Sequence, residues 1–280
     1  LLEPLLKFMS RHGRYPKTGE LEVDHERCIK EQFQTLGRAM NLIYKVTEDT
    51  YWERVRTQCK SELVVYAALS RFGRRPKFGS LGKTLQRDIK THFNTYREVT
   101  TLGDRLLASS GNPTLILMSA RSSKVGKQTP SALYVHRNAV AELPPLLQVY
   151  EGCARVLSGN IPRANMIKLS VLKPQISFLT YPDFEANAHP TLASAVTVNL
   201  RDLSVDWRDY TRSTNPPLLH RKEEFVGADD PRRALYEKLT ASEVRAGLYE
   251  RPEQIGRLDG WRQTLDRRSK IVRGHRLFNK

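Results

Sequence analysis

The sequence predicts an α+β fold, in which an N-terminal helical array with two tandem helix-turn-helix-like repeats precedes a small antiparallel-sheet module with C-terminal helices. Three observations support this: an internal repeat with a period of 60 residues, apolar residues at helical spacing as far as residue 158, and alternating apolar and polar residues after Gly159. We therefore expect a mostly helical domain over residues 1–158, with repeat copies at about 1–60 and 61–110, and an α+β domain over residues 159–280.

The repeat emerges when the sequence is aligned with itself at an offset of 60 residues. Residues 10–42 then fall on residues 70–102 without a gap, and fourteen of the 33 aligned positions are identical. Each copy reads as a helix, a basic turn and a second helix. Gly13 and Gly73 suit the left-handed residue that ends a helix, and the proline three residues later prevents the helix from continuing. One copy cannot cover its own apolar faces, so we expect the two copies to pack together.

The turn of each copy is strongly cationic. The chain carries 46 Lys and Arg against 30 acids, a net charge of +16, which predicts attraction to polyanions and most often to nucleic acid. A proline-stiffened loop at a helix end holds cations at low entropic cost, which suits a phosphate backbone. An ordinary solvated turn beside a helix C-terminus is the alternative, because the helix dipole favours cations there. The expected nucleic-acid contacts are Arg11, Arg14, Lys17, Arg71, Arg74, Arg75 and Lys77.

Helices are also predicted between the repeat and residue 158. Thr129-Pro130 is typical of a helix start and predicts a helix as far as Glu142. Pro144-Pro145 ends that helix and begins another, whose apolar stripe extends to Leu157.

Short strands are predicted after Gly159. Alternating residues or short apolar runs indicate four strands of an antiparallel sheet with one face exposed to water, at 167–171, 176–181, 196–200 and 203–207. Helices with proline in the first turn are predicted at 231–248 and 252–265. The segment from Arg262 to Lys280 holds seven cations against Asp266 alone, so it is a second candidate polyanion surface or an ordinary solvated tail.

Composition excludes several classes of protein. The three cysteines are far apart, which excludes a disulfide framework and a typical zinc knuckle and suits a reducing, cytoplasmic location. No run of 18 apolar residues is present, so we expect no membrane partner. The first residue is Leu1 rather than Met, and we therefore expect the chain to be a fragment.

The α+β module contains the candidate catalytic residues. Asp183, His220 and Lys222 are acid–base candidates that the fold would have to bring together. A turn-forming Asn-Pro-Pro at residues 215–217 with a surface charge run is the alternative account. His189 and His220 lack the spacing of metal ligands, so no metal site is expected. No Gly-x-Gly-x-Gly loop follows a strand, so no S-adenosylmethionine site is expected in this chain.

Several long segments together resemble one family. They are Leu63–Lys77, Val125–Lys127, Leu133–His136, Leu146–Ala154, Tyr181–Phe184, Arg208–Tyr210, Asn215–Glu223 and Arg273–Leu277. These segments resemble the C-terminal part of the DNA phosphorothioation-associated methyltransferases of bacteria, and the resemblance covers nearly the whole chain.

The resemblance implies a role in a bacterial system for DNA modification or defence, in which sulfur is placed in the DNA backbone. It implies S-adenosylmethionine for an upstream domain that this chain lacks, and it makes DNA and other phosphorothioation proteins the expected partners. This chain would then be the DNA-binding or targeting region of such an enzyme. Two alternatives stay open: an enzyme with its own acid–base site around Asp183, His220 and Lys222, and a protein–protein scaffold.

Overall fold

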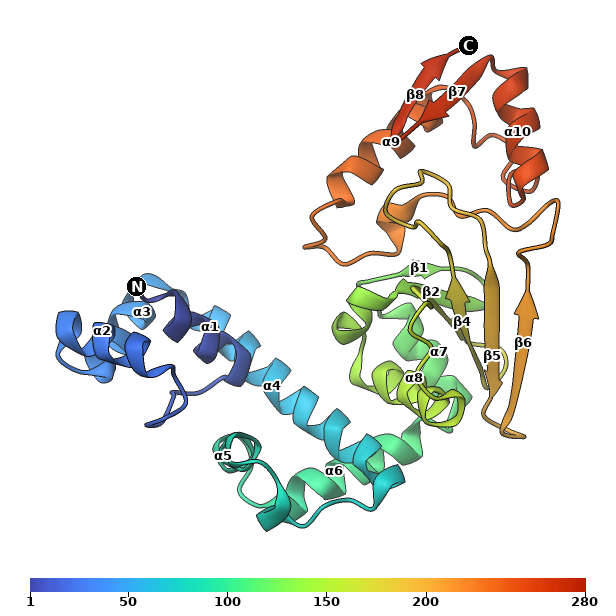
Figure 1. Cartoon of the computed structure of the whole chain (residues 1–280). Coiled ribbons are helices and arrows are strands. Elements are labelled where there is room, and N and C mark those ends of the chain that lie inside the picture. Colours follow the sequence, from blue (N-terminus) through green and yellow to red (C-terminus); the bar gives the residue numbers. More distant parts are fainter. The chain divides into compact units, whose positions relative to one another are not determined.

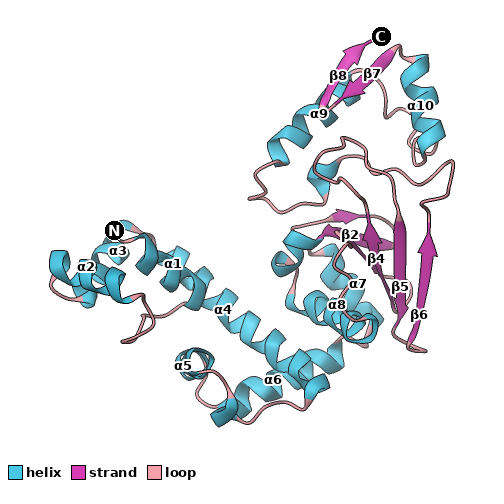
Figure 2. Cartoon of the chain, in the orientation of Figure 1, coloured by secondary structure: helices cyan, strands magenta, loops and turns pink.

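A computed structural model describes every residue from Leu1 to Lys280 and confirms the α+β fold. The chain divides into two compact units, Leu1–Ala108 and Ser109–Lys280. Helices make up the first unit, and all the strands belong to the second (Figure 2). No helix combines the length and the apolar character needed to cross a membrane.

The N-terminal unit is a helical array built from the duplication. Its helices are α1 (Glu3–His12), α2 (Val23–Phe33), α3 (Leu36–Val46), α4 (Asp49–Leu69), α5 (Lys83–His92) and α6 (Tyr96–Ser109) (Figure 1). At the 60-residue offset, α2 corresponds to α5 and α3 to α6, while α1 corresponds to the end of α4 and a 3₁₀ turn at Ser70–Gly73. The sequence repeat is thus also a repeat of helices.

Each copy has a core of its own. In the first copy, Leu5, Ile29 and Trp52 are among the buried residues that pack together, and Ile89 and Phe93 belong to a separate cluster in the second copy. Ile29 and Ile89 occupy equivalent positions, so the same apolar stripe builds both cores. The turn after α1 makes polar contacts with α5 of the second copy.

The C-terminal unit is built around a six-stranded antiparallel sheet with strands in sequence order. The strands are β1 (Lys127–Gln128), β2 (Ala132–His136), β3 (Met166–Ser170), β4 (Gln175–Thr180), β5 (Ser194–Asn199) and β6 (Ser204–Asp209). The helices of the unit are α7 (Pro113–Arg121), α8 (Pro145–Ser158), α9 (Arg233–Arg245) and α10 (Leu258–Arg267). A separate hairpin pairs β7 (Lys270–Arg273) with β8 (Arg276–Asn279).

The two faces of this sheet pack against different elements. On one face α8 contacts β4 and β5, and its Arg155 guanidinium lies 5.1 Å from the centre of the Phe178 ring. On the other face Met166 and Leu179 pack with Phe184 and with Tyr236 of α9. The four strands predicted after Gly159 are confirmed within one or two residues, and so is the helix that begins at Pro145.

The division between the units lies about 50 residues before the predicted boundary at 158/159. The change of hydrophobic period at Gly159 marks the entry into β3, but β1 and β2 already belong to the same sheet, and α8 packs on it. Residues 109–158 are therefore part of the second unit.

The helix predicted from Thr129 to Glu142 is wrong. That segment forms β2 and a 3₁₀ helix at Arg137–Glu142. Four of the five side chains of β2 are buried, so the strand lacks the alternation that would identify it. At the C-terminus, α10 begins six residues after Pro252, and the basic segment that follows forms the β7–β8 hairpin.

Candidate nucleic-acid interface

The first cationic turn begins where α1 ends at Gly13. Gly13 has φ 60°, and its N–H caps the helix by donating to the carbonyl oxygen of Met9. A Cβ atom at this position would lie 2.9 Å from His92 Cε1 and 3.1 Å from Cys59 Sγ. Glycine is therefore needed both for the left-handed backbone and for the close approach of α4 and α5.

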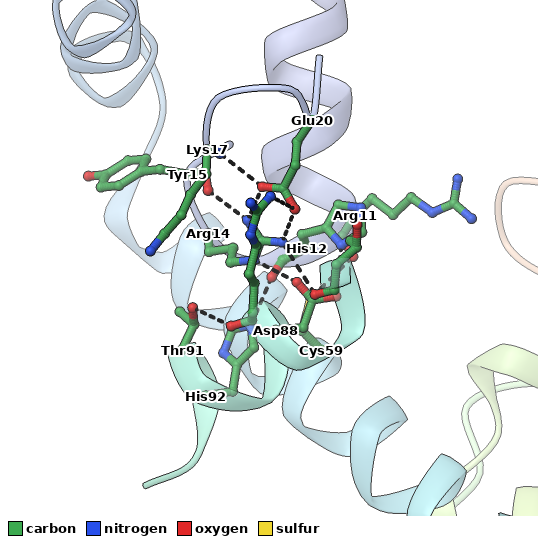
Figure 3. A network of polar contacts seen from close by, with 12 residues as sticks. Arg11, His12, Arg14, Tyr15, Lys17, Glu20, Cys59, Asp88, Thr91 and His92 are labelled. Atoms are coloured by element: carbon green, nitrogen blue, oxygen red, sulfur yellow. Dashed lines mark hydrogen bonds and ion pairs between the residues drawn. The ribbon is translucent and has the colours of Figure 1, made fainter. Parts of the chain in front are cut away.

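Arg14 is folded inward, so its expected contact with nucleic acid is wrong (Figure 3). Its side chain is 4% exposed. Two guanidinium nitrogens donate to the Glu20 carboxylate at 2.7 Å each, and Nε donates to Asp88 Oδ1 at 2.6 Å. The hydrogen bond from Arg14 holds the pKa of Glu20 at about 2. Arg14 thus fixes the first turn against α5 of the second copy.

Two further contacts strengthen this junction between the copies. His12 Nδ1 lies 3.0 Å from Asp88 Oδ2, and His92 Nε2 lies 2.8 Å from the carbonyl oxygen of His12. The two copies are therefore in contact, with Asp88 at the centre of the polar junction, although each copy has an apolar core of its own and does not need the other to cover it (Figure 3). Arg11 and Lys17 are the cations of the first turn that stay exposed.

The second cationic turn is open at the equivalent place. Arg71, Arg74 and Lys77 are all exposed and form no ion pair. A Cβ atom added to Gly73 would meet no atom within 4 Å, whereas the equivalent Gly13 is tightly enclosed. The left-handed residue here is Arg74 itself, with φ 55°. Phe72, the counterpart of His12, is 49% exposed.

Two differences explain why Arg74 is free and Arg14 is not. Ser80 stands at the position equivalent to Glu20, so the local carboxylate is missing from the second turn. Asp88 reaches Arg14 from the following copy, and no third copy follows the second. The equivalent arginines therefore differ: Arg14 packs the first copy against the second, and Arg74 has no ion-pair partner.

Arg75 has a different place from the other cations of the second turn. Its guanidinium donates to Asp104 Oδ1 at 2.6 Å and to the carbonyl oxygen of Ala67 at 2.7 Å. The hydrogen bond from Arg75 lowers the pKa of Asp104. Arg75 therefore ties the turn to α4 and α6 next to Arg74.

The three catalytic candidates have separate sets of partners. Asp183 is exposed, with φ 54°, and has no ion-pair partner. His220 Nε2 lies 2.7 Å from the carbonyl oxygen of Ile255, and its ring lies against His189 and Trp261. Burial lowers the pKa of His220 to about 3. No contact joins these side chains into a catalytic group.

Lys222 is a structural cross-link in the interior. Its side chain is almost wholly buried, and Nζ donates to the carbonyl oxygens of Phe184 at 2.6 Å and Asn187 at 2.7 Å. His275 Nε2 lies 2.9 Å from Nζ and is its third polar contact. Burial lowers the pKa of Lys222 to about 7. The three contacts join the loop after β4 to the β7–β8 hairpin.

A buried polar network accompanies these residues and was missed by sequence reasoning. Glu243 of α9 is fully buried, accepts a hydrogen bond from Tyr249 OH at 2.8 Å and lies 2.7 Å from His189 Nε2. His189 and Glu243 are 54 residues apart, so no spacing motif identifies them. No group of three or more His, Cys, Asp or Glu side chains is placed to hold a metal ion.

Comparison of the chain with family models, with curated proteins and with solved structures found no match.

Proposed function

We propose that the helical unit contacts DNA through its second turn, with Arg71, Arg74 and Lys77 as phosphate-binding residues. The observation that carries the proposal is that these three cations are exposed and unpaired on one short turn, while the equivalent arginine of the first copy is neutralised. Salt-dependent attraction to phosphates is the main source of affinity in proteins that bind nucleic acid. Arg75 supports the same proposal, because it stiffens the turn.

The wider role we propose follows the resemblance in the sequence. The chain would be the DNA-binding and targeting region of a methyltransferase associated with bacterial DNA phosphorothioation, acting with other proteins of that system. S-adenosylmethionine would be bound by an upstream domain. The separate surroundings of Asp183, His220 and Lys222 give no support to an acid–base site in this region.

Duplex DNA binding measured by fluorescence anisotropy over a salt series tests the proposal. Replacing Arg71, Arg74 and Lys77 together with alanine should lower the slope of log K against log salt by about one per lost phosphate contact. The matched control replaces Arg54, Arg56 and Lys60, three exposed cations of α4, and should leave most of the slope intact. Equal losses in the two triple variants, or binding that does not depend on salt, would overturn the proposal.

A further inference from the structure

The sheet of the C-terminal unit has one long open edge. At one end of the strand order β1 has only two residues, and at the other end β6 has six (Figure 1). All six residues of β6 are exposed. An edge strand presents unpaired N–H and C=O groups, and proteins usually protect such an edge with charged side chains, especially lysine, with proline or with a bulge. The sequence of β6, Ser-Val-Asp-Trp-Arg-Asp, has neither lysine nor proline, and its three charges are of both signs, so they can pair with a complementary strand.

The register with β5 shows which backbone groups are free. The N–H of Tyr210 donates to the carbonyl oxygen of Ala193 at 2.8 Å, which directs the backbone of Tyr210 toward β5. In an antiparallel pair this direction alternates from residue to residue. The N–H and C=O groups of Val205, Trp207 and Asp209 therefore face away from the sheet.

The side chains of β6 alternate between a face with Val205, Trp207 and Asp209 and a face with Asp206 and Arg208. Val205 and Trp207 lie opposite Val198 and Val196 of β5, on the face of the sheet that α8 covers at β4 and β5. At β6 this face is open, and Val205 is 46% exposed and Trp207 64% exposed. Asp206 and Arg208 lie on the other face, and neither forms an ion pair within the chain.

We propose that β6 is a homodimer interface, in which two copies of this chain pair their β6 strands antiparallel about a twofold axis through Trp207. The charges favour this register over its two neighbours. An axis at Asp206 would place two aspartates opposite each other, and an axis at Arg208 would do the same with two arginines. Like charges in direct opposition destabilise a strand pair.

With the axis at Trp207, the outward backbone groups pair and the charges of Asp206 and Arg208 find partners. Trp207 then lies opposite Trp207 of the second chain, and Val205 lies opposite Asp209. All three residues have outward N–H and C=O groups, as a hydrogen-bonded pair requires. Asp206 of each copy lies opposite Arg208 of the other, which gives two equivalent ion pairs. This self-complementarity specifies a second copy of the chain rather than an unrelated peptide.

The oligomeric state of the full chain, measured by light scattering from low to high micromolar concentration without DNA, tests the interface. The native chain should reach twice its monomer mass. Asp206→Arg and Arg208→Asp should each shift it to monomer, because each substitution makes two like-charge pairs. The variant with both substitutions exchanges the charges and should recover the dimer.

The charge exchange also controls for misfolding, because a variant that recovers the dimer must be folded. Arg163→Asp changes an exposed arginine outside the sheet and should leave the dimer intact. A native chain that stays monomeric at every concentration would overturn the proposal. A dimer that persists in both single variants, or one that the double variant does not recover, would overturn it as well.

Discussion

Arg14 and Arg74 show how neighbours decide the role of a residue. They occupy equivalent positions of a duplicated turn, but only Arg14 has carboxylates beside it. Half of this difference can be read from the sequence, since Glu20 is only six residues from Arg14 and is replaced by Ser80 in the second copy. The other half, the contact with Asp88, spans 74 residues and depends on how α5 packs, which no local pattern reveals.

Arg14→Ala should destabilise the N-terminal unit by at most about 3–5 kcal/mol, because two largely buried carboxylates lose their shared partner and keep only Arg87 and His12. Arg74→Ala is the matched control and should change the free energy of unfolding by less than about 0.5 kcal/mol. Urea unfolding of the full chain measures both. Similar losses in the two variants would show that the two arginines have the same role.

His220 makes the stability of the C-terminal unit depend on pH. Its pKa is about 3 in the folded chain, well below the ordinary value of 6.5, because burial disfavours the charged ring. The unfolded chain therefore binds the extra proton first, and stability should fall as the pH drops below about 6.5, by up to about 1.4 kcal/mol per pH unit.

His220→Asn should lower the slope of the unfolding free energy against pH by the amount that corresponds to about one bound proton. Unfolding free energies measured between neutral and mildly acidic pH check this. Part of the fall should persist in the variant, because burial also lowers the pKa of His275, to about 4. An unchanged slope in His220→Asn would contradict the structural account.

At the level of elements, sequence patterns were sufficient wherever polar residues interrupt the apolar ones with a clear period. Strands β4 and β5 and the helices of the repeat carry such a period, and a proline marks the start of α8. Strand β2 does not, because it is buried on both faces. The β7–β8 hairpin was missed because its turn, at Gly274, lies in a run of cations that reads as a tail.

The carboxylate that the second turn lacks can be restored by one substitution. Ser80→Glu places a carboxylate where Glu20 binds Arg14 in the first copy, so it should pair with Arg74 and lower DNA affinity about tenfold at low salt. Ser80→Gln has nearly the same shape without the charge and should bind DNA as the native chain does. Equal affinities of the two variants would mean that Arg74 does not contact phosphate.

For the whole molecule, duplication has produced two turns with different roles: the first joins the two copies, and the second exposes its cations to solvent. Packing between the copies uses the first arginine, and the end of the array leaves the second unpaired. The net charge of +16 supplies general attraction to polyanions, but it does not say where they bind. We propose that polyanions bind at Arg71, Arg74 and Lys77.

Lysine acetylation of the native chain with and without duplex DNA, read out by mass spectrometry, tests this placement most directly. Lys77 lies on the second turn, and Lys60 is an exposed lysine of α4 that serves as an internal reference. We expect DNA to protect Lys77 strongly and to leave the modification of Lys60 nearly unchanged. Equal modification of Lys77 in the presence and absence of bound DNA would contradict the account.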